Sequence, residues 1–199
     1  MNKLRNWDTT PAQMGGAFEP LTPGGHIVRI LRAEIASSRN NGREMMVLTV
    51  DIDEGTQNDG YFRRVFDARK STGDGRTLPK WPNGGMYYRL TTADNGDADP
   101  HFKGLIKAIE ESNSGYRWDW NEAGLRGKRV GMIYREEEFE TQDGQIKTTV
   151  KPMAVCPASE AMDKPAPRKK AVSAVLESGF TPVSDDDLPF DLFGRKVVM

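Results

Sequence analysis

Between Met45 and Ile52 the chain alternates two sets of side chains with the period of a β-strand. One set is Met46, Leu48, Val50 and Ile52, and the other is Met45, Val47, Thr49 and Asp51. Since successive side chains of a strand point to opposite faces, this pattern predicts a strand with two unequal faces. An Ile-, Val- and Leu-rich run over 26–35 precedes it, and Asn40-Asn41-Gly42 supplies turn residues between the two runs. The two runs therefore predict a β-hairpin.

Two further stretches are predicted to add strands to this hairpin. The run over 60–68 follows the turn residues Asn58-Asp59-Gly60 and is aromatic and basic, so it is predicted as a third strand. Gly, Asp, Arg and Lys dominate residues 71–82, a composition typical of a loop. Residues 84–90 then predict a short returning strand.

One helix and a closing hairpin complete the pattern. Asp99-Pro100 predicts a helix start, because Asp can cap free backbone amides and Pro suits the first turn. Helical spacing follows in Phe102, Leu105, Ile106 and Ile109. Two alternating segments, 128–139 and 146–155, flank Asp143-Gly144, which is a strong short-range signal for a hairpin.

Three strands, a helix and a hairpin are the element order of an OB-fold. That fold is a five-stranded Greek-key barrel with one helix between strands 3 and 4. Other small barrels and α+β sandwiches share this order and stay open as alternatives. We expect an N-terminal arm over 1–23, an OB-like barrel over 24–156, and a disordered linker and acidic tail over 157–199, where Pro, Ala, Ser and charged residues replace the alternation.

Composition narrows the class of protein. A chain of 199 residues with 37% hydrophobic content can bury one ordinary core. The sequence contains no apolar run of membrane-spanning length and no apolar signal-peptide core near Met1, so we expect a cytoplasmic protein without membrane contact. The single Cys156 excludes an internal disulfide, and with only His26 and His101 beside it no Cys/His zinc set can form.

Charge is unevenly distributed along the chain. Net charge is -1, yet Arg63 to Lys80 holds six basic and two acidic residues, a local balance of +4. Binding of single-stranded nucleic acid requires cations for phosphates and flat rings for bases. The same stretch and the residues after it supply both, so the predicted nucleic-acid-binding residues are Arg63, Arg64, Arg69, Lys70, Lys80, Trp81, Tyr87, Tyr88 and Arg89. Alternation requires some of these rings to be core.

Other candidate groups are interpreted as structural. Three aromatic side chains would point to the same side of an extended chain: Tyr116, Trp118 and Trp120. We expect them to pack the barrel against the helix rather than to form a stacking platform. The carboxylates of Asp51, Asp53 and Glu54, and those of Glu136, Glu137 and Glu138, resemble Mg²⁺ ligands in type but alternate between faces. We therefore expect no metal, no cofactor and no catalytic site.

Several segments resemble a family of small phage and prophage proteins associated with single-stranded-DNA binding or recombination. They are Trp81-Pro82-Asn83-Gly84-Gly85, the helix from Phe102 to Asn113, Trp118-Asp119-Trp120, Leu125-Arg126-Gly127-Lys128 and Asp143-Gly144. The resemblance covers about Gly24 to Val155. It implies a DNA-handling role and carries no catalytic assignment.

The C-terminal region holds a second resemblance. Asp185, Asp186, Asp187, Leu188, Pro189 and Phe190 resemble the acidic tail tip through which bacterial single-stranded-DNA-binding proteins dock on replication and repair partners. Here Asp191 to Met199 follow, so Phe190 is not the terminal residue. The physical expectation is that carboxylates find a basic rim while Phe190 supplies a desolvated anchor. A solubilising acidic tail is the alternative.

Together these patterns predict a non-enzymatic single-stranded-DNA-binding protein of phage or prophage replication or recombination. The acidic tail would recruit replication or recombination proteins. The first alternative is an adaptor that binds such a protein through the barrel, which the near-neutral charge favours. A metal-dependent nuclease subunit is a more distant alternative. Oligomeric state stays open, with a homo-oligomer among the possibilities.

Overall fold

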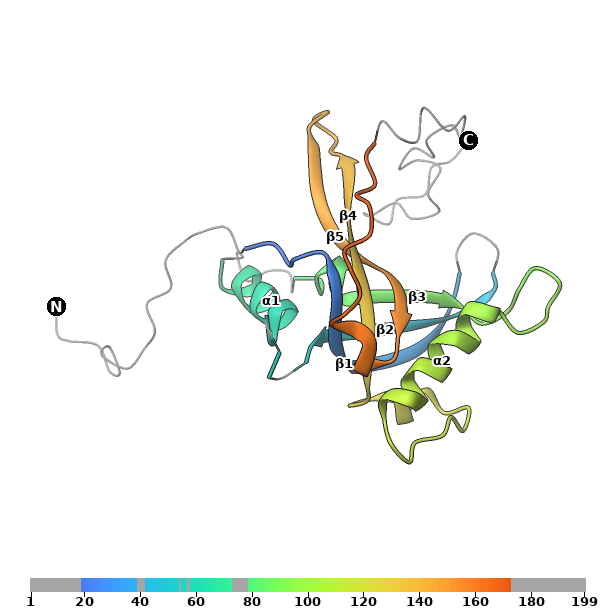
Figure 1. Ribbon diagram of the computed structural model, residues 1–199. Coiled ribbons are helices and arrows are strands. Elements are labelled where there is room, and N and C mark those ends of the chain that lie inside the picture. The colour runs from blue at the N-terminus through green and yellow to red at the C-terminus, as the bar shows by residue number, and fades with distance from the viewer. Residues whose placement is uncertain (1–18, 39–41, 54, 57, 73–78, 173–199) are drawn as a thin grey trace.

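The computed structural model describes residues 19–38, 42–53, 55–56, 58–72 and 79–172 (Figure 1). These form one antiparallel sheet with short helices around it. In chain order the elements are β1 (Gly24–Ser37), β2 (Glu44–Ile52), α1 (Tyr61–Thr72), η1 (Asn83–Gly85), β3 (Met86–Leu90), α2 (Pro100–Ser112), η2 (Glu122–Leu125), β4 (Arg129–Glu140), β5 (Ile146–Cys156) and α3 (Ala158–Ala161). No helix in these ranges is long and apolar enough to cross a membrane.

The five strands form a single sheet in the order β3-β2-β1-β4-β5. The long strand β1 lies at its centre, and its first half pairs with β4 while most of its length pairs with β2. A register shift between Ile30 and Arg32 places an extra residue in β1, as in a β-bulge, which increases the local twist of a strand. The mainly β prediction with five strands and a helix between β3 and β4 is confirmed.

One face of this sheet supplies the core. Buried side chains at alternate positions of β1, β2 and β4 meet the apolar side of α2, and the members that are fully covered include Val28, Ile30, Met46, Leu48, Val50, Leu105, Ile109, Val130, Met132 and Tyr134. The predicted strand with two unequal faces is thus observed, with Met46, Leu48, Val50 and Ile52 in the core. Asp99 caps α2 as expected, because its Oδ1 accepts hydrogen bonds from the backbone amides of His101 (2.8 Å) and Phe102 (3.0 Å).

The predicted strand over 60–68 is wrong, because these residues belong to helix α1. Phe62 and Phe66 lie four residues apart, so they share a face in a helix as well as in a strand, and their spacing fits both periods. Helix-favouring Arg, Ala and Lys residues extend α1 to Thr72, into the predicted loop. The third strand of the sheet is instead β3, close to the short strand predicted at 84–90.

The chain stays packed beyond Cys156, where the linker was predicted to begin. Helix α3 lies against the start of β1 and β4, and Ala161 approaches so closely that a Cβ on Gly25 would be 1.6 Å from the Ala161 carbonyl oxygen. The following segment bonds β1 through the Lys164 carbonyl oxygen, which accepts from the Gly25 amide (3.1 Å), and reaches β4 at a parallel bridge between Glu137 and Lys170. Small residues on both sides allow this contact. The remaining tail, 173–199, lies outside the described residues.

Candidate nucleic-acid interface

A buried carboxylate on β2 positions the basic helix α1. Asp51 Oδ1 accepts hydrogen bonds from the backbone amides of Phe62 (2.8 Å) and Ile52 (2.9 Å), and Oδ2 accepts one from the amide of Arg63 (3.1 Å). Burial raises the pKa of Asp51, while these amide donors oppose the shift. Because Asp51 bonds amides in the first turn of α1, it fixes the helix at the end of β2.

Helix α1 carries four of the predicted cations. Arg63, Arg64, Arg69 and Lys70 are all exposed. The Arg63 guanidinium lies 5.2 Å from the centre of the Trp81 ring, and Arg64 donates a hydrogen bond to the Asp59 carbonyl oxygen. Neither contact neutralises the charge of the arginine. The helix therefore presents positive charge to solvent.

Trp81 belongs to the packing beneath this helix more than to the surface. Its Nε1 donates to the Val50 carbonyl oxygen (3.2 Å), and its ring packs against Phe66 with centroids 5.4 Å apart. The side chain is partly buried against the core. The Arg63 guanidinium lies over the Trp81 ring, and Lys80 beside Trp81 is exposed.

The predicted tyrosine pair on β3 divides between two faces. Tyr87 is buried in the core, whereas Tyr88 is 53% exposed on the opposite face. Arg89 follows Tyr87 to the core side, where its Nη2 donates to the Tyr87 hydroxyl (2.7 Å) and its guanidinium lies over the Tyr87 ring. Tyr88 is therefore the one tyrosine of the pair that is placed to stack on a base.

Tyr88 lies on the side of β2 and β3 that faces away from the α2 core, which we call the open face. It comprises Met45, Val47, Thr49 and Asp51 of β2, of which Val47 and Asp51 are buried, and Met86, Tyr88 and Leu90 of β3. Tyr88 pairs with Val47 in the register of β2 and β3. Asp51, which bonds the Arg63 amide, is four residues from Val47 on the same side of β2. At about 3.3 Å a residue, Val47 and Asp51 are about 13 Å apart along β2.

Two arginines that the sequence analysis did not single out extend the basic character onto β1 and β4. Asp53, only 2% exposed, binds Arg29 Nε (2.8 Å) and Arg129 Nε (2.5 Å). The two guanidinium groups are 40% and 44% exposed, so one carboxylate is shared by two cations and a positive charge remains. Arg29 pairs directly with Arg129 across the strands. The available sequence signal was the alternation along β1, which places Arg29 on the side opposite the buried Val28 and Ile30.

Two glutamates in the acidic run of β4 form ion pairs within the molecule. Glu137 bonds Arg135 (2.5 Å) and lies 3.5 Å from Lys151 Nζ, and Glu138 bonds Lys169 Nζ (2.8 Å). Burial acts to raise the pKa of Glu137, but the Arg135 hydrogen bond and nearby positive charges outweigh it and lower that pKa. Across the described ranges, no three His, Cys, Asp or Glu side chains form a group that could hold a metal ion.

The aromatic trio between α2 and β4 does not pack as a unit. Tyr116 and Trp118 are partly buried against the core, as expected. Trp120 is 80% exposed, so the packing role predicted for it is wrong. Its backbone adopts φ 64, which turns the side chain away from the face that the extended pattern implied.

Comparison with known proteins adds no relative. No protein-family model matches this chain, and no curated protein sequence matches it significantly. The resemblances to the phage family and to the acidic tail tip thus stay predictions that depend on the residues quoted above. The tip itself, Asp185 to Phe190, lies outside the described residues.

Proposed function

We propose that this protein binds single-stranded DNA across the open face, with the cations of α1 at one end. The observation that carries the proposal is that Tyr88 and Asp51 share one side of the sheet, where Asp51 bonds the Arg63 amide at the start of the basic helix α1. Exposed guanidinium and ammonium groups suit phosphates, and the exposed Tyr88 ring suits a base. Net charge of the whole chain is -1, so this local concentration of cations is what favours a nucleic acid.

The OB-fold interpretation supports this assignment. The order β3-β2-β1-β4 places the fourth strand beside the first, as a Greek key does, and α2 lies between β3 and β4. The sheet edges also converge: a Cβ on Gly84, just before β3, would be 2.7 Å from the Val150 carbonyl oxygen of β5. We infer a partly open barrel. OB-folds bind oligonucleotides on the face of strands 2 and 3, which is the open face here.

Single strands are the proposed ligand because stacking requires an unstacked base. A base that stacks on an aromatic side chain contributes roughly 1 to 3 kcal/mol, whatever its identity. In a duplex the bases are already stacked on one another, so Tyr88 can gain nothing from them. The contacts proposed here therefore favour single strands without selecting a sequence.

In the cell we propose a role in phage or prophage replication or recombination, where the protein coats exposed single strands and recruits partner proteins through Asp185 to Phe190. This part depends on the sequence resemblances. No cofactor or reaction is part of the proposal. The protein acts by covering the strand, which keeps it from pairing and from nucleases.

An adaptor that binds a replication or recombination protein is the second candidate. The observation that favours it is the apolar content of the open face, where Met45, Met86 and Leu90 are partly exposed around Tyr88. Such side chains suit the core of a protein interface. The two candidates differ in their response to salt, because counterion release makes DNA binding strongly salt-dependent.

A titration separates the two candidates. Fluorescein-labelled poly-dT and a mixed-sequence duplex are each titrated with the protein at about 50 and 200 mM salt. We expect binding of poly-dT that weakens steeply with salt, and much weaker binding of the duplex. Equal affinity for duplex and single strand would overturn the proposed mechanism. Absence of binding to either would leave the adaptor as the better account.

A further inference from the structure

The loop between α2 and β4, residues 113–128, is held closed at its base. The Asn113 side chain donates from Nδ2 to the carbonyl oxygens of Ile109 (2.7 Å) and Arg129 (2.8 Å). Its Oδ1 accepts from the Arg129 amide (3.0 Å). One side chain thus joins the end of the helix to the start of the strand, and the loop has a defined geometry.

Within this loop, Trp120 combines two unfavourable features. Its φ of 64 lies in the left-handed region, where a residue with a Cβ is strained. Its side chain is 80% exposed, so no burial offsets the strain. Strain of this kind persists only where the surrounding structure imposes it, and it is concentrated at functional sites.

The residues on either side impose this conformation. The Trp118 amide donates to Glu110 Oε1 on α2 (2.9 Å). Asp119 Oδ1 accepts from the Asn121 amide (3.2 Å), and Asn121 Oδ1 accepts from the Ala123 amide at the start of η2 (3.1 Å). Hydrogen bonds before and after Trp120 therefore hold its backbone, and the indole is presented in a fixed position.

The ring is supported on one side and surrounded by polar groups. Trp118, which packs on the core, lies 6.3 Å from Trp120 between ring centres at an angle of 56°. Arg117 and Arg126 are exposed in the same loop, as is Asp119, and Arg117 Nη1 donates to the Tyr116 carbonyl oxygen (2.9 Å). The loop therefore carries one exposed aromatic ring and two exposed arginines.

We infer that Trp120 is a second base-stacking site for single-stranded DNA, with Arg117 and Arg126 available to the adjoining phosphates. This inference depends on the proposed function and extends it to a residue outside the open face. A protein hot spot would require apolar neighbours that exclude water around the anchor. None of the other large hydrophobic side chains that are exposed in the described ranges belongs to this loop. Stacking requires only an exposed ring and nearby positive charge.

The end of the loop connects Trp120 to the sheet. The Gly127 amide donates to the Ile30 carbonyl oxygen (2.7 Å), and the Ile30 amide donates to the Lys128 carbonyl oxygen (2.9 Å). The loop thus runs alongside β1 just before Arg129, which pairs with Arg29. Both arginines carry partly exposed guanidinium groups on the outward side of the sheet. They supply phosphate contacts between the open face and the loop.

The test compares three variants of the full chain in a titration of labelled poly-dT. Trp120→Gly should weaken binding roughly five- to a hundredfold, the loss expected for one stacked base, and Trp120→Phe should weaken it less. Ile146→Ala, which removes another highly exposed apolar side chain on β5, should leave affinity unchanged. Glycine accepts positive φ, so the Trp120→Gly protein should melt at the same temperature as wild type or higher.

Each outcome decides the inference. Unchanged affinity of Trp120→Gly, with Tyr88→Ala weakened, would overturn the stacking role of Trp120 and leave the proposed function standing. A Trp120→Gly protein that loses both affinity and melting temperature would show a packing role, which also overturns it. Loss of affinity in Trp120→Gly but not in Tyr88→Ala would support the loop and refute the open face. If wild type binds no single strand, both proposals fail.

Discussion

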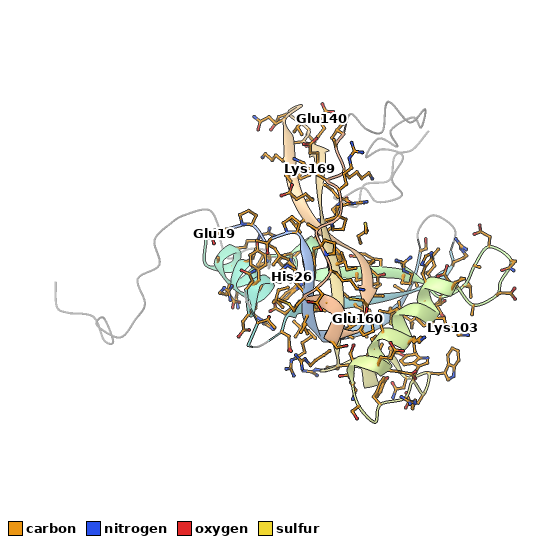
Figure 2. The ribbon with its side chains drawn as sticks, in the orientation of Figure 1. Glu19, His26, Lys103, Glu140, Glu160 and Lys169 are labelled. Atoms are coloured by element: carbon orange, nitrogen blue, oxygen red, sulfur yellow. The ribbon has the colours of Figure 1, made fainter. Side chains whose placement is uncertain are left out.

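The basic helix α1 and the projecting β4–β5 arm use charge in opposite ways. The arm comprises residues 135–140 and 146–151 with residues 164–170 alongside, and it extends from the sheet with Glu140 near its tip and Lys169 at its side (Figures 1 and 2). Its acidic groups bond Arg135, Lys151 and Lys169. On α1, Arg63 lies on Trp81 and Arg64 bonds a backbone carbonyl, so both retain their positive charge.

A run of like charges does not by itself identify a binding surface. The run from Glu136 to Glu140 is the densest acidic stretch of the described residues. Within it, Glu137 and Glu138 form ion pairs inside the arm. On α1, by contrast, the contacts of Arg63 with the Trp81 ring and of Arg64 with a backbone carbonyl leave the charge of both arginines unneutralised. Ion pairs within the fold, rather than composition, distinguish charged side chains that stabilise the structure from those that can bind a ligand.

Charge reversal in each of the two regions is expected to give the largest difference in DNA binding. Arg63→Glu, Arg64→Glu and Lys70→Glu in one protein should lower affinity for poly-dT by about two orders of magnitude at low salt. The slope of log affinity against log salt should become shallower by about 2, since each lost phosphate contact removes about 0.7 for single strands. Fluorescence titration across a salt series measures both quantities.

The matched control places three charge reversals on the arm. Lys147→Glu, Lys151→Glu and Lys169→Glu change the net charge of the chain by the same amount. This protein should keep a salt slope close to that of wild type while its melting temperature falls. Equal slopes in the α1 and arm variants would show that only net charge matters, and the assignment of the site to α1 would be wrong.

The next largest effect is expected at Tyr88. Tyr88→Ala should cost roughly 1 to 3 kcal/mol of binding free energy, because it removes one stacking ring from the open face. Stability should change little, since the side chain is 53% exposed. Tyr88→Phe keeps the ring and should bind like wild type. A Tyr88→Ala protein with unaltered affinity would move the site away from β3.

The two regions should also respond oppositely to acid. Glu137 has a lowered pKa, so its contribution to stability is full above the ordinary glutamate pKa and is lost as pH falls through the folded value. Asp51 has a raised pKa, so its protonation in acid favours the folded state. Hydrogen exchange at falling pH should therefore show the arm opening before α1 separates from β2.

A substitution isolates the contribution of the arm. Glu137→Gln should lower the free energy of unfolding at neutral pH by about 1 to 2 kcal/mol, because it removes the charge that Arg135 and Lys151 bond. The difference from wild type should shrink as the solution is acidified. Thermal unfolding at several pH values measures it, and a constant difference would show that the carboxylate charge is not the cause.

The smallest expected effect on DNA binding comes from the acidic tail. Deletion of Asp185 to Met199 should leave affinity for poly-dT unchanged or raise it a few-fold, since the carboxylates compete with phosphates for the basic surface. Pull-down of replication or recombination proteins should be lost, and Phe190→Ala should reproduce most of that loss. Capture that survives Phe190→Ala with Phe193→Ala would show that charge alone acts.

Sequence patterns predicted the strands of this fold better than its surface. The alternation of Met46, Leu48 and Val50 identified the core face of β2, and Asp99-Pro100 identified the start of α2, because both signals are local. The run over 60–68 misled because Phe62 and Phe66 share a face in either structure. The contact that distinguishes the helix, the bonding of its first amides by Asp51 ten residues before Tyr61, is not local in sequence.

Residues of the candidate site were predictable only where the alternation of a strand decides which side chains are exposed. Tyr88 and Tyr87 had to point to opposite sides of a strand, but which side was the core depended on the pairing of β3 with β2. The exposure of Trp120 depended on a positive φ held by hydrogen bonds that the Asp119 and Asn121 side-chain oxygens accept. The pairing of Arg29 with Arg129 joins strands that are distant in sequence, so no local pattern reveals it.

Photochemical crosslinking tests directly whether a base of single-stranded DNA stacks on Tyr88 of the open face. An oligo-dT that carries 5-iodouracil is irradiated on the full chain, and the crosslinked residues are identified by mass spectrometry. Iodouracil reacts with aromatic rings stacked on it, so we expect adducts at Tyr88 of the open face and none at Phe139, which is 41% exposed on the arm. Crosslinks at Phe139 without any at Tyr88 would contradict the account.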